Sequence, residues 1–161
     1  MARKNGSAGT PATVALDRAG IAYQVHAYDH DPAAASYGLK AAELLGVAPA
    51  RVFKTLLADT GSGLVVGVVP VDRRLDPKAL AATVGAKRAQ LADPAAERSS
   101  GYVVGGISPI GQRRALPTVL DVSALDHDTI LVSGGRRGLD LELSPADLVT
   151  VTRARTAPIA R

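Results

Sequence analysis

The sequence contains no cysteine and no tryptophan, and only 3% of its 161 residues are aromatic. The absence of cysteine excludes a disulfide framework, a thiolate nucleophile belonging to the protein and a zinc site with cysteine ligands. No apolar run approaches the ~20 residues that a membrane-spanning helix needs, and residues 1–11 lack the apolar core of a signal peptide. We therefore expect a cytoplasmic protein, in which any thiol chemistry comes from a ligand.

Length and charge predict one globular domain with two basic tails. A chain of 161 residues, 47% of them hydrophobic, is long enough for one core and too short for two ordinary domains. The net charge is +4, and residues 1–11 and 153–161 contain basic residues but no acidic ones. We expect these two segments to be disordered tails around a domain at 12–152.

Within the domain, positive charge is local. It occurs in three pairs, Lys87-Arg88, Arg113-Arg114 and Arg136-Arg137. A single pair is usually just part of a solvated surface. Three pairs, two of them beside glycine-rich turns, favour a surface for a polyanion.

Hydrophobic periodicity and capping residues predict alternating helices and strands. The segment 77–84 is the strongest helix prediction, because Asp76 is a good N-cap, Pro77 suits the first turn and Gly85 ends the helix. Further helices are predicted at 12–19, 37–45, 94–98 and 145–149. Strands are predicted at 21–28, on both sides of 61–63, and at 88–91, 119–120, 130–132 and 139–143. Because several connections are too short for parallel crossovers, we expect a single α/β domain with a mixed, largely antiparallel sheet.

Familiar catalytic motifs are missing. The sequence has no Gly-x-Ser-x-Gly elbow and no Walker lysine pattern. His26 and His30 are close together, but the turn at Asp31-Pro32 makes surface residues a better interpretation than metal ligands. We expect no metal and no cofactor.

Two glycine-rich stretches remain. In "GYVVGGISPIGQ", Gly105 and Gly106 precede Ser108-Pro109, a turn that exposes backbone N–H groups as a cradle for an anion or oxyanion. The stretch "VSGGRRGLDLEL" is typical of a tight hairpin, since it lacks the strand-to-helix context of a dinucleotide-binding loop.

Lys54 interrupts an apolar strand. In "RVFKTLL", alternation places Lys54 between Val52 and Leu56 on one face, so that face is not open to water. Such a lysine either extends to the surface or lines a pocket for an anion.

Four stretches of the sequence, in this order, carry a family resemblance: "YQVHAYDHDP", "VFKTLL", "GYVVGGISPIGQRRALPTVLD" and "VSGGRRGLDLEL". They resemble the YbaK family of free-standing aminoacyl-tRNA editing domains, in particular bacterial Cys-tRNA(Pro) deacylases. The resemblance covers most of 12–150. It implies a barrel-like mixed sheet surrounded by helices, and hydrolysis of the ester that joins a wrong amino acid to tRNA(Pro).

The resemblance also implies a set of site residues. Lys54 matches the family lysine, 105–109 the Gly-x-x-x-Pro loop, and Asp140 the pocket aspartate. Tyr28 and Tyr37 match aromatic pocket positions, although a phenylalanine is expected at Tyr37. We expect the catalytic residues to be Lys54, Gly105, Gly106 and Asp140, the substrate-binding residues Tyr28, Tyr37, Thr55, Ile107, Ser108 and Pro109, and the tRNA phosphate contacts Arg136 and Arg137.

The implied mechanism needs no protein nucleophile. In cysteine-specific members the substrate thiol attacks its own ester, and the amino acid leaves as a cyclic thiolactone. The alternatives are an Ala-tRNA(Pro) deacylase of the same fold, a non-catalytic tRNA- or nucleotide-binding module, and a structural protein in which Lys54 only protects an edge strand. The expected partners are mischarged tRNA(Pro) and, as a second partner, prolyl-tRNA synthetase.

Overall fold

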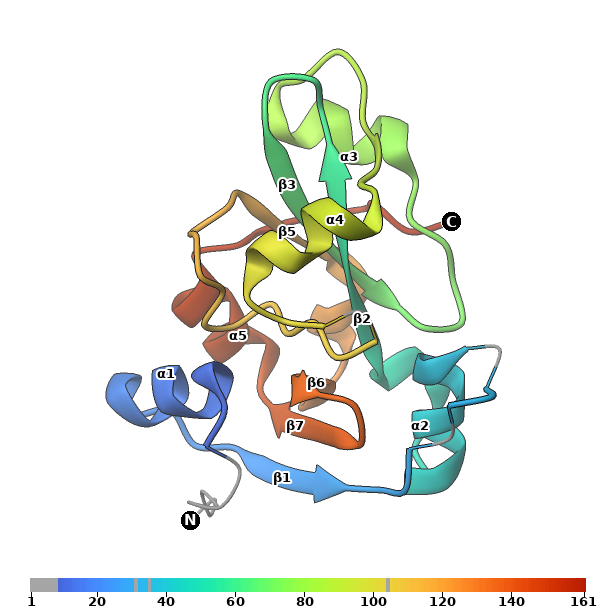
Figure 1. The fold of residues 1–161 in the computed structure, drawn as a ribbon, viewed down its shortest axis with the longest axis vertical. Helices are drawn as coiled ribbons and strands as arrows, with labels where there is room; N and C mark the ends of the chain where they lie inside the picture. The colour runs from blue at the N-terminus through green and yellow to red at the C-terminus, as the bar shows by residue number, and fades with distance from the viewer. Residues whose placement is uncertain (1–8, 31, 35, 104) are drawn as a thin grey trace.

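The computed structural model describes residues 9–30, 32–34, 36–103 and 105–161 (Figure 1). Its α-helices are α1 Pro11–Ala19, α2 Tyr37–Leu45, α3 Pro77–Val84, α4 Pro94–Glu97 and α5 Pro145–Thr152. Its strands are β1 Gln24–Ala27, β2 Phe53–Asp59, β3 Leu64–Pro70, β4 Gln90–Leu91, β5 Thr118–Asp121, β6 Ile130–Arg136, β7 Leu139–Leu143 and β8 Arg155–Ala157. Short 3-10 helices occupy Pro49–Arg51, Arg98–Ser100 and Val122–Asp126.

The helices begin at side-chain caps. The Asp76 carboxylate accepts hydrogen bonds from the first-turn N–H groups of α3, and Ser36 caps α2 in the same way. Helices α1, α2 and α3 each end at a glycine in the left-handed conformation: Gly20, Gly46 and Gly85. These local signals explain why the predicted helix positions agree closely with those observed.

The strands form two sheets. Three strands follow the order β1-β7-β6, and five follow the order β4-β2-β3-β5-β8. The pairs β3–β5 and β5–β8 are parallel, whereas all other strand pairs in the described residues are antiparallel. The expected mixed, largely antiparallel α/β domain is therefore confirmed. The sheets meet at a bridge between Val52 and Leu131 but do not close, so the expected barrel-like character is absent.

The two faces of β2 differ in their surroundings. Phe53 and Leu57 are buried in the main core, and Thr55 lies on the same face. Lys54 and Leu56, on the opposite face, are half-buried. A second, smaller core around Leu80 and Ile159 packs against the other side of the five-stranded sheet. Strand β2 is therefore covered on both faces, as its sequence predicts.

The prediction of a disordered C-terminal tail at 153–161 is wrong. Strand β8 pairs with β5, and Ile159 is fully buried. The buried Asp121 carboxylate accepts hydrogen bonds from the backbone N–H groups of Ile159 and Ala160, each at 2.9 Å. An apolar residue and a fixed acceptor thus hold a segment whose charge had indicated disorder. In the expected N-terminal tail, residues 1–8 lie outside the described residues, whereas Thr10 caps α1 and Pro11 begins it.

In the described part of the chain, none of the helices combines the length and the apolar character needed to cross a bilayer.

Candidate active site

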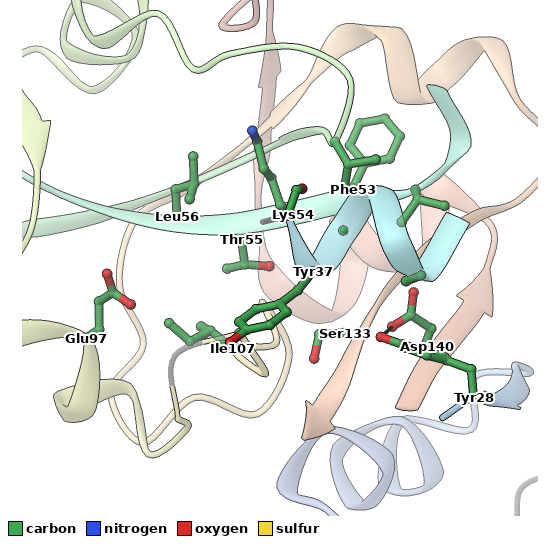
Figure 2. A pocket seen from close by; sticks show the side chains of 16 residues that line it. Tyr28, Tyr37, Phe53, Lys54, Thr55, Leu56, Glu97, Ile107, Ser133 and Asp140 are labelled. Atoms are coloured by element: carbon green, nitrogen blue, oxygen red, sulfur yellow. Dashed lines mark hydrogen bonds between the residues drawn. The ribbon is translucent and has the colours of Figure 1, made fainter. Parts of the chain in front are cut away.

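A cavity of about 260 Å³ lies where α2 approaches the first half of β2 (Figure 2). Strands β6 and β7, together with Glu97, Gly105 and Ile107, complete its walls. The lining residues are Tyr28, Ser36, Tyr37, Gly38, Ala41, Val52, Phe53, Lys54, Thr55, Leu56, Val71, Glu97, Gly105, Ile107, Ser133 and Asp140. Segments that are far apart in the sequence therefore meet at one small concave site.

The structure brings most of the expected site residues together here. The expected residues that line the cavity are Lys54, Gly105, Asp140, Tyr28, Tyr37, Thr55 and Ile107. The expected residues outside its lining are Gly106, Ser108, Pro109, Arg136 and Arg137.

Lys54 reaches the cavity from β2 as a half-buried cation. Burial, and then the positive charge of Arg74, lower the pKa of its ammonium group, while Asp72 acts in the opposite direction. Among the described residues, no carboxylate lies within 4.0 Å of its Nζ atom. Figure 2 shows the ammonium group pointing away from Asp140. The structure thus holds a cation that an anionic ligand would stabilise.

Thr55 presents a hydroxyl group that lacks a partner. Its side chain is 8% exposed, and Oγ1 makes no hydrogen bond to any described residue. A buried polar atom of this kind costs stability unless a ligand or water satisfies it. Thr55 is therefore suited to donate a hydrogen bond to a bound substrate.

Asp140 and Tyr28 form the polar end of the cavity. The Tyr28 hydroxyl donates a hydrogen bond to Asp140 Oδ1 at 3.4 Å, the dashed contact in Figure 2. Burial raises the pKa of Asp140 to about 7, although the bond from Tyr28 opposes this change. Burial and the nearby Asp140 charge also raise the pKa of Tyr28. A carboxyl group with a pKa near 7 can accept and return a proton at neutral pH.

The glycine loop packs very closely against its neighbours. Gly105 has φ 84°, and a Cβ atom there would lie 2.6 Å from the Tyr37 ring. A Cβ atom on Gly106 would lie 2.9 Å from backbone atoms of Arg136 and Arg137. The loop therefore requires glycine at both positions, for conformation at the first and for space at the second.

The backbone of this loop differs in one respect from the expected cradle. The Gly106 N–H group already donates to the Val103 carbonyl at 2.9 Å, so it is not available for an oxyanion. Ser108 is fully buried, and its Oγ accepts a hydrogen bond from Ile110 N at 3.2 Å. Pro109 is buried beside it. These three residues shape the loop from outside the cavity lining.

Tyr37 forms the aromatic wall at the start of α2. Its ring meets the His30 ring edge-on, with 4.9 Å between centroids, and the Arg137 guanidinium lies 5.2 Å from its centroid. The latter geometry is typical of a cation–π contact. Arg137 thus lies beside the cavity even though it is not part of the lining.

Three polar lining residues, Ser36, Glu97 and Ser133, were not predicted from the sequence. Ser133 lies directly opposite Asp140 in the β6–β7 register, and its Oγ accepts a hydrogen bond from Gly135 N. It belongs to the quoted "VSGGRRG" stretch, which could have indicated it. Glu97 ends α4, and burial, together with Asp93, raises its pKa. No local signal in the sequence points to Glu97.

The histidines do not form a metal centre. His26 Nε2 lies 2.8 Å from Glu142 Oε1 on the neighbouring strand. Within the described residues, no group of three or more His, Asp or Glu side chains is arranged to hold a metal ion.

Comparisons with known proteins identify the family of the chain. Residues 31–151 match the family model of the aminoacyl-tRNA editing domain. A protein of Enterococcus faecalis, named "Putative Cys-tRNA(Pro)/Cys-tRNA(Cys) deacylase EbsC", is 38% identical over 120 residues, which cover 73% of each chain.

Solved structures share the fold. A "putative trans-editing enzyme for prolyl tRNA synthetase" superposes with a TM-score of 0.81 at 24% identity, covering 99% of both chains. The hypothetical protein APE2540 superposes with a TM-score of 0.79 at 28% identity, covering 91% of this chain and 96% of that one. The chain belongs to the aminoacyl-tRNA editing domain family, as its motifs predicted, and is an aminoacyl-tRNA deacylase.

Proposed function

We propose that this deacylase removes cysteine from mischarged tRNA(Pro), and that the substrate's own thiol is the nucleophile. The relative named as a Cys-tRNA(Pro)/Cys-tRNA(Cys) deacylase supports the choice of substrate. The reaction takes place where aminoacyl-tRNAs are made, in the cytoplasm, and needs no metal or cofactor.

The observation that carries the mechanism is the chemistry of the cavity walls. The sequence has no cysteine, and no histidine belongs to the lining described above. The Ser36 and Ser133 hydroxyl groups accept backbone hydrogen bonds, and neither donates a hydrogen bond to a carboxylate or imidazole among the described residues. Neither these serines nor Thr55 donates to a base, and the pKa of the Tyr28 hydroxyl is raised, so we infer that the attacking atom comes from the substrate or from water.

The size of the cavity suits one small aminoacyl group. A volume of about 260 Å³ is slightly below the range of ordinary ligand pockets, which begins at about 300 Å³. A cysteinyl ester fits in such a space, whereas a cysteinyl ester together with its nucleoside does not. The terminal ribose and phosphate then lie at the mouth of the cavity.

Lys54 binds this RNA end in our proposal. Its half-buried ammonium group lacks a carboxylate partner in the described structure, so a phosphate or a ribose oxygen would compensate its desolvation. The Thr55 hydroxyl, which has no partner, donates to the ester carbonyl oxygen and stabilises the developing oxyanion. Thr55 thereby takes the role that Gly106, with its N–H occupied, cannot fill.

Asp140 transfers the thiol proton to the leaving group in this proposal. The thiol transfers its proton to the Asp140 carboxylate as sulfur attacks the ester carbon and the S–C bond forms. The C–O bond to the ribose then breaks, and Asp140 returns the proton to the leaving ribose oxygen. Since the pKa of Asp140 is about 7, both transfers are feasible near neutral pH.

Substrate discrimination tests the mechanism. The enzyme should hydrolyse Cys-tRNA(Pro) and spare Ser-tRNA(Pro), which has nearly the same shape but a much weaker nucleophile. Rates are compared with purified protein and tRNA(Pro) charged with Cys, Ser, Ala or Pro. Equal rates for Cys and Ser would contradict attack by the thiol and indicate an activated water. Preferential cleavage of Ala-tRNA(Pro) would identify an alanine-specific deacylase instead.

The second proposed partner is prolyl-tRNA synthetase. One of the proteins with the same fold is described as a trans-editing enzyme for that synthetase. Co-purification of the two proteins with and without tRNA(Pro) tests this association.

A further inference from the structure

A second concave surface lies away from the active site, and three arginines line it. The cleft has a volume of about 640 Å³ and lies where the β2–β3 turn, the end of α3, the segment before β5 and the segment between α5 and β8 meet. Its charged lining residues are Arg114, Arg153 and Arg155. No Asp or Glu belongs to its described lining, so the cleft is strongly positive.

The cleft and the active site lie toward opposite ends of the same strand. Leu64, at the start of β3, lines the cleft, and Val71, just after its end, lines the active-site cavity. Seven residues of β-strand separate the two by about 20 Å. Figure 1 shows the β2–β3 turn at the end of the molecule opposite to β1 and α2. The cleft is therefore a separate surface.

Two of the arginines are available to a ligand. Arg155 Nη1 donates to the Thr83 carbonyl at 2.8 Å, which fixes it against the end of α3. Arg114 and Arg153 are exposed, and neither forms an ion pair with another described residue. Arg155 thus supports the cleft, while Arg114 and Arg153 present guanidinium groups.

Arg153 occupies a position where the backbone favours glycine. It ends α5 with φ 56°, and it is the only non-glycine residue with positive φ in the described chain. At the same position α1, α2 and α3 have glycine. A strained arginine at this site indicates a role for its side chain beyond the turn itself.

We infer that this cleft binds the phosphate backbone of the RNA strand that leads away from the 3′ end held in the active site. This inference rests on the proposed function, because it extends the binding of the same tRNA. Arginine guanidinium groups bind phosphates through paired hydrogen bonds, and such contacts to the backbone carry no preference for base sequence. A surface about 20 Å from the reacting ester selects substrates with a tRNA body over short aminoacylated fragments.

The experiment compares the wild type with Arg114→Ala/Arg153→Ala. A matched control, Arg18→Ala/Lys78→Ala, removes the same charge from exposed helix positions elsewhere. Affinity for uncharged tRNA(Pro) is measured across salt concentrations. Deacylation is measured on charged tRNA(Pro) and on a charged CCA trinucleotide.

We expect the cleft variant to bind tRNA about 10-fold more weakly and its salt slope to fall by about 0.7 to 0.9 for each phosphate that is no longer neutralised. Its KM for charged tRNA should rise with kcat unchanged, and its rate on the trinucleotide should equal that of the wild type. The control should resemble the wild type in every assay. Arg153→Gly, which suits the left-handed turn, should show a part of this loss of affinity without loss of folding.

Unchanged tRNA affinity and salt slope in the cleft variant would overturn the inference and leave an acidic protein as the occupant. Equal losses in the control would also overturn it, because the effect would then be one of net charge. If the wild type cleaves no charged tRNA, the proposed function fails, yet the salt-dependent binding data still decide whether the cleft contacts RNA.

Discussion

The Tyr28 hydroxyl donates its hydrogen bond to a carboxyl group, Asp140, whose pKa is raised to about 7 by burial. The two residues come from segments that are far apart in the sequence and adjacent in the three-stranded sheet. Burial of Asp140, opposed by this contact, determines the protonation of the carboxyl group and a part of the protein's pH-dependent stability.

Replacing Asp140 with asparagine should stabilise the protein at pH 8 by about 2 kcal/mol. A carboxyl group whose pKa is raised on folding contributes its full stabilisation of the folded state below its unfolded pKa of about 3.9. This stabilisation is lost as the pH rises through about 7. The gain should therefore disappear near pH 4. Urea denaturation at both pH values checks this, with the exposed Asp126→Asn as control. A gain of equal size at both values would contradict the raised pKa.

Replacing Lys54 with alanine should reduce deacylation by about 100-fold, because the RNA end and the ester lose their anchor. The melting temperature should stay the same or rise, since the substitution removes a desolvated charge that has no carboxylate partner in the described structure. Lys54→Arg should also be poor, because the planar guanidinium does not replace a compact ammonium group. Full activity in Lys54→Ala would show that Lys54 is only a strand residue.

Gly106→Ala should destabilise the protein by about 1 to 3 kcal/mol. The added Cβ atom would lie 2.9 Å from the backbone of Arg136 and Arg137, which cannot move without displacing the β6–β7 turn. Gly67→Ala is the matched control, because there the nearest atom, at 3.0 Å, is the movable Cδ1 of Leu75. Denaturation midpoints and deacylation rates of the two variants should differ clearly. Equal effects would mean that the loop has room to adjust.

Asp121→Ala should lower the free energy of unfolding by about 3 kcal/mol, since two backbone N–H groups lose a charged acceptor. Burial raises the pKa of Asp121, but the hydrogen bonds from Ser123, Ile159 and Ala160 lower it by more. The pKa in the folded protein is therefore below its ordinary value. This stabilisation is present above the unfolded pKa and is lost as the pH falls through the folded pKa. Amide hydrogen exchange at Ile159 should become faster at pH 7, and an unchanged rate would contradict the anchoring role.

Replacing both Arg136 and Arg137 with alanine should weaken tRNA binding and reduce its salt slope by about 0.7 to 0.9 for each phosphate that these arginines neutralise. Both side chains are exposed on the β6–β7 turn beside the cavity, and Arg137 stacks on Tyr37. Unlike the cleft variant, this variant should also lose activity on a charged trinucleotide, because it alters the wall formed by Tyr37. An unchanged salt slope would place these arginines in solvent, away from the RNA.

Local signals made much of the fold predictable. The helix at 77–84 was placed from Asp76, Pro77 and Gly85, and it agrees with α3 at both ends. Strand β8 was missed because "RTA" is short and lacks a hydrophobic pattern, and because its partner β5 is distant in sequence.

The site was predictable where a motif marks it and not elsewhere. Lys54, Thr55 and Asp140 lie on strands whose alternation, or whose resemblance to the family, indicates them. Glu97, at the end of α4, reaches the cavity only through the tertiary fold, and no pattern within α4 indicates this position. The occupied N–H group of Gly106 is likewise a property of the folded loop.

The cavity has one wall of strands and another of helix and loop. Lys54, Thr55 and Asp140, which carry the proposed chemistry, are held by hydrogen-bonded ladders, whereas Tyr37, Glu97 and Gly105 are on α2, α4 and the glycine loop. Substitutions on the second wall can change the shape of the side-chain pocket while the reacting groups keep their places. In the proposed mechanism the fold thus separates selectivity from catalysis, and a library limited to Tyr37 and Glu97, with Gly105 kept, is the direct route to a deacylase for a different amino acid.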